Sequence, residues 1–125
     1  MNEKKLVFDF DYENDILFFY SEKNYGYEFS VFLNESIVMD FNKNKVPIGL
    51  EIFNASKLFK TKKHFLKTIY EGSLEILISK EKIKSNLTLS IKIHNKDTKT
   101  PQLNFVGVND LQIPNINTEL LVASL

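Results

Sequence analysis

Three stretches of this 125-residue chain decide its predicted fold: FDYENDILFF at residues 10–19, IVMDF at 37–41 and IGLEIFNASK at 48–57. Apolar and acidic residues alternate through residues 6–11, which is the period of a half-buried strand, and a second strand follows a polar turn at 16–21. The second and third stretches form a hairpin, because asparagines in the 42–45 turn tolerate a left-handed backbone. With a further strand at 25–34, the first half is predicted to be an antiparallel meander of about five strands.

The second half of the chain is predicted to begin with a helix and to continue as strands. Asn54 is a favoured N-cap residue, and Gly72 suits a helix C-terminus. The expected apolar stripe between them consists of Leu58, Phe59, Phe65, Leu66 and Ile69. Alternation at 74–78 and 83–93, and apolar residues at 103–108, indicate antiparallel strands. The predicted class is therefore α+β: the meander, one amphipathic helix, then C-terminal antiparallel strands.

The quoted stretches resemble a family of small bacterial and archaeal proteins known as domain of unknown function 2283. Its members show an aromatic residue and Asp, a gap, a second Asp and an apolar pair, as at residues 10–17. They then show an apolar–Asp strand, a turn, and Gly-apolar-Glu-Ile before an Ala-Ser helix start, as at residues 37–57. The resemblance covers residues 8–57 and implies a fold. Relatives sometimes occur beside toxin-like proteins, which implies an antitoxin-like role.

Length and composition indicate a single domain over residues 1–125, made of the family-like part at 8–57 and a strand-rich extension at 73–125. The chain has no Cys, which excludes disulfides, thiolate metal sites and thiol nucleophiles. We expect no metal, no cofactor and no membrane span. We expect a cytoplasmic location, because the charged start of the chain runs directly into a strand pattern.

The net charge is zero, but the two halves differ in sign. Residues 1–56 contain ten acidic and five basic residues, and residues 57–125 contain eleven basic and six acidic ones. Solvated lysine-rich faces explain this difference most simply. Complementary docking between subunits, or an anionic partner for the lysine side, is the alternative.

The candidate binding residues are those that match the family's pattern: Asp11, Asp15, Asp40, Gly49 and Glu51. If Phe41 pairs with Val46, Asp40 and Glu51 share a face but stand about four residues apart, on the order of 13 Å. That separation predicts no acid–base pair. We expect Asp11 and Asp15 to bond the backbone of their turn, although a loosely bound cation there remains open. Gly49 is expected to allow close approach of another backbone or ring.

The remaining polar residues favour no catalytic site. His64 and His94 have no second His or Cys at metal-ligand spacing. Lysines cluster at residues 57–67, but the chain has no Arg, the usual bidentate reader of guanine, so we expect no sequence-specific nucleic-acid recognition. The aromatic row Tyr25, Tyr27 and Phe29 is expected to face the core.

The C-terminal tail is predicted to be an interface. Its apolar residues Leu120, Leu121, Val122 and Leu125 would dock on the chain itself, on a second copy or on another protein. We therefore predict a homo-oligomer and a non-enzymatic protein-binding or self-assembling module. The alternative is a small carboxylate-based hydrolase, or a protein that binds a metal or another ligand.

Overall fold

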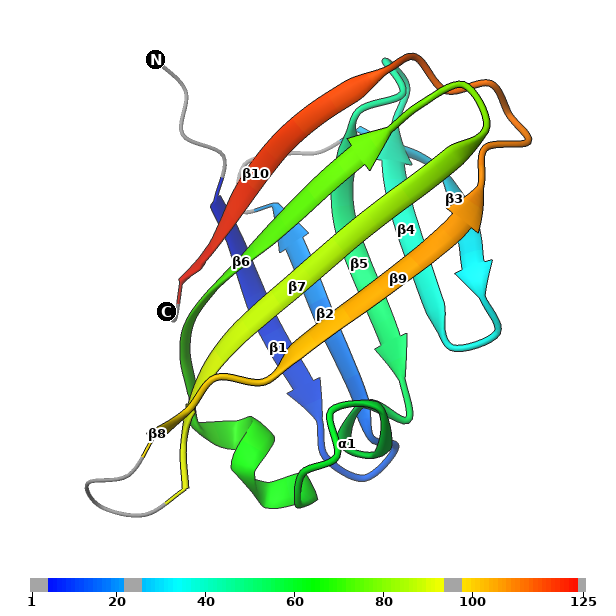
Figure 1. Ribbon diagram of the computed structural model, residues 1–125. Coiled ribbons are helices and arrows are strands. Elements are labelled where there is room, and N and C mark those ends of the chain that lie inside the picture. The colour runs from blue at the N-terminus through cyan, green and yellow to red at the C-terminus, as the bar shows by residue number, and fades with distance from the viewer. Residues whose placement is uncertain (1–4, 22–25, 94–97, 124–125) are drawn as a thin grey trace.

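The computed structural model describes residues 5–21, 26–93 and 98–123. Its strands form one ten-stranded sheet that curls on itself, so that β10, β6, β7 and β9 cross in front of β1, β2, β5, β4 and β3 (Figure 1). The first-half strands are β1 (Lys5–Asp11), β2 (Ile16–Ser21), β3 (Tyr27–Asn34), β4 (Ile37–Asn42) and β5 (Pro47–Phe53). The later ones are β6 (Ile69–Ile78), β7 (Lys82–Lys92), β8 (Thr98–Lys99), β9 (Gln102–Val108) and β10 (Ile116–Ala123).

The predicted α+β class is wrong, because the amphipathic helix does not form. The described residues between β5 and β6 contain α1 (Ala55–Leu58), of four residues, and η1 (Lys63–Thr68), a 3-10 helix of six. Lys60 has a φ of 56°, which ends helical geometry after one turn. Gly72 lies within β6, where a Cβ would come 2.5 Å from the carbonyl oxygen of Thr88 on β7. The chain therefore needs glycine there for sheet packing, and not for a helix end.

The predicted strands of the first half are present, but their order is not that of a meander. The sheet order is β3-β4-β5-β2-β1, so β5 returns to pair with β2. The tail is also a strand: β10 pairs parallel to β1 and antiparallel to β6. It joins the two halves of the sheet into one, which gives a mixed sheet instead of an antiparallel one.

The core lies between the two crossing halves. Alternate residues of each strand point into it, including Phe19, Met39 and Phe41 from one half, and Leu74 and Leu87 from the other. At the far edge, β9 meets β3 without a hydrogen-bonded ladder among the described residues. Gly107 allows this contact, because a Cβ there would lie 2.7 Å from Cδ2 of Leu33. Within the described residues, no helical segment combines the length and the apolar character that a membrane crossing requires.

Candidate binding surface around Asp40 and Glu51

A β-bulge in the β4–β5 hairpin brings Asp40 and Glu51 together. Phe41 pairs with Pro47, the register shifts at the next residue, and Asp40 then pairs with Gly49. Glu51 pairs with Val38, so the two acids are diagonal neighbours on the outer face, with Cα atoms about 7–8 Å apart. The expected separation of four residues was therefore wrong. That prediction paired Asp40 with Pro47, two residues away from its observed partner Gly49. An error of two residues leaves both acids on the same face of the sheet but changes the distance between them along the strands.

The Glu51 carboxyl lies against Asp40 and has a raised pKa. Burial, a hydrogen bond to Asp40 and the charge of Asp40 raise the pKa of Glu51 to about 7. Two carboxylates in contact cannot both ionise without strong repulsion, so the second proton is lost near neutrality. Protonated Glu51 donates to the Asp40 carboxylate, and this arrangement makes the pair a site whose charge changes near physiological pH.

Asp40 continues the hydrogen-bonded chain toward the sheet edge. The Ser30 hydroxyl donates to Oδ1 of Asp40 at 2.6 Å, and the hydroxyls of Tyr27 and Ser30 lie 2.8 Å apart. A register shift between Tyr27 and Phe29 turns Tyr27 outward while Phe29 stacks on Phe41 in the interior. The expected core-facing row is therefore wrong for Tyr27 and correct for Phe29; Tyr25 lies outside the described residues.

Gly49 leaves room for the Asp40 carboxylate and for the β2 backbone. A Cβ at this position would lie 2.8 Å from the carbonyl oxygen of Phe19 and 3.3 Å from Oδ2 of Asp40. The expectation that Gly49 permits a close backbone approach is confirmed. The neighbouring β2 residue in the ladder is Tyr20, whose ring is exposed.

Asp11 and Asp15 lie at the β1–β2 turn and do not join the Asp40–Glu51 pair. Hydrogen bonds from the side chain and backbone of Asn14 lower the pKa of Asp11. Asp15 is buried, and its carboxylate accepts from the Ser56 N–H at 3.0 Å and the Ser56 hydroxyl at 2.7 Å. Asp15 thus caps α1 from a distant part of the chain. No group of three or more His, Cys, Asp or Glu among the described residues could hold a metal ion.

The most exposed apolar side chains of the described residues gather along β3 and β9, where the sheet almost closes. The five that are more than half exposed are Tyr27, Phe32, Val106, Val108 and Leu111. We call this set the apolar seam. A groove of about 360 Å³ runs through it, lined from β3 by Ser30, Phe32 and Leu33 and from the other side by Val108 and Leu111. Ser30 lines the groove and also donates to Asp40, so the seam adjoins the carboxyl pair.

The tail residues divide between core and surface. Leu120 and Val122 are buried within the same chain, whereas Leu121 is exposed. Leu125 lies outside the described residues. The apolar tail therefore completes the domain's own sheet, and Leu121 remains the described tail residue that could contact a partner.

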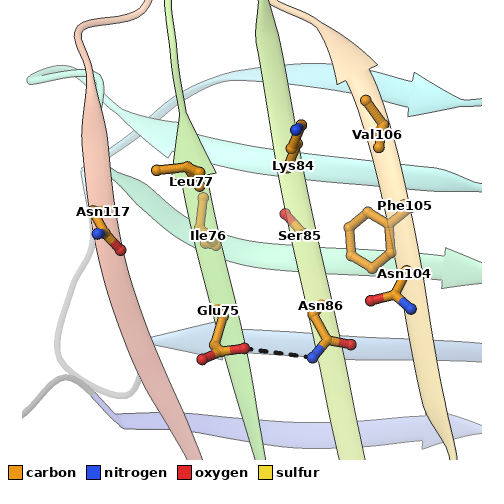
Figure 2. A pocket seen from close by; sticks show the side chains of 10 residues that line it. All are labelled: Glu75, Ile76, Leu77, Lys84, Ser85, Asn86, Asn104, Phe105, Val106 and Asn117. Carbon is orange, nitrogen blue, oxygen red and sulfur yellow. Dashed lines mark hydrogen bonds between the residues drawn. The ribbon is translucent and has the colours of Figure 1, made fainter.

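A second concave region lies on the outer face of the front strands (Figure 2). It has a volume of about 370 Å³ and mixes apolar Leu77 and Val106 with polar residues of β6 and β7. The Asn86 amide donates to Glu75 across the two strands at 3.4 Å, a long hydrogen bond. The Asn86 carbonyl oxygen is buried without a partner. This face is well separated in the fold from Asp40 and Glu51 and provides matched control positions.

Sequence reasoning missed the apolar seam. The alternation that places Phe29 in the core puts Phe32 on the outer face of its strand. Val108 and Leu111 are isolated apolar residues at the end of β9 and beyond it. The available signal was the combination of an outward Phe on an edge strand with a Val–Asn–Asp–Leu turn. This signal predicts a binding surface only when β9 is known to lie beside β3.

Comparison with known proteins agrees with the resemblance. The family model described as "Protein of unknown function (DUF2283)" matches residues 8–56, which contain all of β2 to β5. Asp40, Gly49 and Glu51 therefore lie within the matched segment. No solved structure matches the chain.

One curated relative extends the similarity over nearly the whole chain. The "Uncharacterized protein MJ0789" of Methanocaldococcus jannaschii is 33% identical over 115 residues, which cover 87% of this chain and 97% of the relative. The similarity therefore includes the strand-rich second half as well as the matched segment. The chain belongs to the DUF2283 family of proteins of unknown function.

Proposed function

We propose that this protein is a non-enzymatic protein-binding module and that the apolar seam is its binding surface. The observation that carries the proposal is that three strongly exposed apolar side chains, Phe32 of β3, Val108 of β9 and Leu111 just after β9, line one groove. Exposed apolar clusters bordered by polar groups are typical of protein interaction sites. Aromatic residues such as Tyr27 and Phe32 contribute disproportionately to binding when a partner desolvates them.

The groove and the hydrogen-bonded chain beside it give the seam a defined shape. Phe32 is 68% exposed and Val108 is 63% exposed, on opposite sides of the groove. A partner side chain inserted between them would contact both. Ser30 and Asp40 supply polar groups at one margin, as in interfaces with an apolar centre and a polar rim.

The test is capture of binding partners from a native cell lysate by immobilised variants. Phe32→Ser combined with Val108→Ser removes the seam. Leu77→Ser combined with Leu121→Ser removes exposed apolar surface that does not line the groove and is the matched control. We expect the wild type and the control to retain a stoichiometric polypeptide other than this chain, and the seam variant to lose it. Equal capture by all three proteins, or by none, would contradict the proposal, provided that circular dichroism shows all three to be folded.

A carboxylate-based hydrolase is the second candidate, and one observation favours it. A Glu with a pKa near 7 is suited to general acid–base catalysis at neutral pH. However, neither the groove of the apolar seam nor the concave region on the front strands is lined by Asp40 or Glu51. A hydrolytic activity lost in Glu51→Gln but kept in the seam variant would establish this candidate in place of the binding module.

A further inference from the structure

The lysines around α1 and η1 form a compact basic surface at one end of the sheet. Lys57, Lys60, Lys62, Lys63 and Lys67 make up this lysine cluster, and the sequence has no acidic residue between Ala55 and Tyr70. Lys63 and Lys67 place their Nζ atoms 4.9 Å and 4.1 Å from the ring centre of Tyr12. These cation–π contacts fix η1 against the β1–β2 turn and hold two of the charges in place.

The outer face of the first-half strands has the opposite charge. The ladder registers place Asp9, Glu51 and Asp40 on this face, with Phe18, Tyr20 and Phe32 among them. We call it the acidic face. Lys5 is the basic residue that the alternation of β1 adds to it, at the far end of that strand from Asp9. Tyr20 and Phe32 are exposed, so the face offers aromatic rings as well as carboxylates.

The two charged surfaces are not neutralised within one molecule. The lysine cluster lies at the strand ends where α1 and η1 are found, and the acidic face lies on the flank of the sheet (Figure 1). In the part of the chain that the structure describes, neither Asp40 nor Glu51 forms an ion pair with a lysine of the cluster. Charges that are segregated in this way within a neutral chain are complementary between copies of it.

We propose that the lysine cluster of one copy docks on the acidic face of the next. A lysine ammonium would be attracted to the Asp40–Glu51 pair, and lysine stems would cover the exposed rings of Tyr20 and Phe32. Gly49 has no side chain that could cover the Asp40 carboxylate beside it. Phe32 also lines the groove of the apolar seam, so the two proposed interfaces border each other at this ring, while Val108 and Leu111 on the other side of the groove stay outside the contact between copies.

Such a contact joins different surfaces of identical chains and is therefore heterologous. Each molecule retains one unused acidic face or lysine cluster, so association continues into rings or open chains unless the rotation closes. Because long-range attraction between surface charges dominates, the association depends on ionic strength.

The first experiment is sedimentation velocity of the purified full chain at low and high salt. We expect species larger than the monomer at about 10 mM salt and loss of these species at about 1 M salt, where the Debye length falls from about 30 Å to about 3 Å. A monomer at low salt, including one that binds RNA instead, would overturn the proposal. So would association that is unchanged by salt.

Charge-reversal variants then identify the surfaces. The acidic-face variant is Asp9→Lys with Glu51→Lys, and the cluster variant is Lys57→Glu with Lys62→Glu. Lys82→Glu with Lys84→Glu makes the same change in charge on exposed residues of β7 and is the matched control. Each of the first two variants is expected to be monomeric at low salt, while the control associates as the wild type does. Equal loss in the control would overturn the assignment of these surfaces.

Mixing the acidic-face variant with the cluster variant tests the proposed contact most directly. The acidic-face variant retains an intact lysine cluster, and the cluster variant retains an intact acidic face, so together they can form one productive contact. We expect a one-to-one complex that grows no further. If the mixture stays monomeric, the proposal fails. Should Glu51→Lys prevent folding, Asp9→Asn with Glu51→Gln replaces it, and we expect association about tenfold weaker than in the wild type.

The outcome is separable from that of the proposed binding function. Self-association is measured on purified protein with the apolar seam intact, whereas the capture experiment alters the seam and leaves the charges unchanged. Failure of one does not imply failure of the other.

Discussion

Asp40 and Glu51 are hydrogen-bonded to each other although neither is the direct partner of the other in the β4–β5 ladder. The bulge beside Asp40 creates this diagonal contact, because it moves the strand by one residue relative to β5. Bulges commonly redirect side chains near functional sites. Here the bulge converts two separated surface acids into neighbours, and the pKa of Glu51 rises to about 7.

Because the pKa of Glu51 is raised, we expect the free energy of unfolding to depend on pH. Glu51→Gln is expected to raise the free energy of unfolding by about 1 kcal/mol at pH 8 and to leave it nearly unchanged at pH 5. The pKa of Glu51 is raised from 4.5 to about 7 in the folded state, so its stabilising contribution is complete below about pH 4.5 and is lost as the pH rises through 7. The amide of Gln replaces the protonated carboxyl at every pH. Much of Glu51 is exposed to solvent, and screening by water keeps the effect near this size.

Urea unfolding of both proteins at the two pH values provides the measurement. Asp40→Asn is the companion variant, because it removes the other charge of the pair. An equal difference between the wild type and Glu51→Gln at pH 5 and pH 8 would show that Glu51 does not share a proton in the folded state.

Gly49→Ala is expected to destabilise the protein by about 2 kcal/mol. The added Cβ would collide with the Phe19 carbonyl oxygen and displace the Asp40 carboxylate. Gly26→Ala is the comparison: its Cβ meets no atom within 4 Å, so it should cost about 1 kcal/mol from the positive φ alone. Thermal unfolding measures both changes, and a smaller cost at Gly49 than at Gly26 would contradict the packing described here.

Asp15→Ala is expected to cost about 2 kcal/mol, because it leaves the Ser56 N–H and hydroxyl without their buried acceptor. Asp11→Ala, at the other end of the same turn, should cost much less, because its hydrogen bonds are exposed to water. Chemical denaturation of the two variants checks this contrast. Similar losses for both would show that Asp15 does not hold α1 to the β1–β2 turn.

Within the tail, Leu120→Ala is expected to cost about 2–4 kcal/mol and Leu121→Ala about 0.5 kcal/mol. Leu120 is 2% exposed in the core, whereas its neighbour is 44% exposed on the outer face of β10. Denaturant midpoints of the two variants give the comparison. If Leu120→Ala were neutral, β10 would not be part of the core, and the tail would be free to dock on a partner.

The sequence predicted strands well where one face is apolar throughout. The 83–93 pattern became β7, and the alternation at 6–11 became β1, because burial on one side enforces a two-residue period. The helix was predicted incorrectly, because Phe59, Leu66 and Ile69 have helical spacing but are buried by two short turns and the start of a strand. The sequence does mark the break at Lys60, because Thr61 directly after it is a residue type that can cap a second helical start.

The sequence was sufficient to predict which residues form the candidate site, but not that two of them are in contact. The family-like pattern identified Asp40, Gly49 and Glu51 and placed them on one face. Their contact depends on a bulge that shifts the ladder between Asp40 and Phe41, and the alternation of apolar and polar residues does not reveal such a shift. The apolar seam depends on β9 lying beside β3, a contact between residues far apart in the chain.

The most direct test of the Asp40–Glu51 pair is a carbon-13 NMR titration of the Glu51 side-chain carboxyl in the folded protein. We predict a midpoint near pH 7 in the wild type and a clearly lower midpoint in Asp40→Asn, where the charge of Asp40 is absent. A wild-type midpoint at the ordinary value of 4.5, unchanged by Asp40→Asn, would show that the two carboxyl groups are independent and would contradict the site described here.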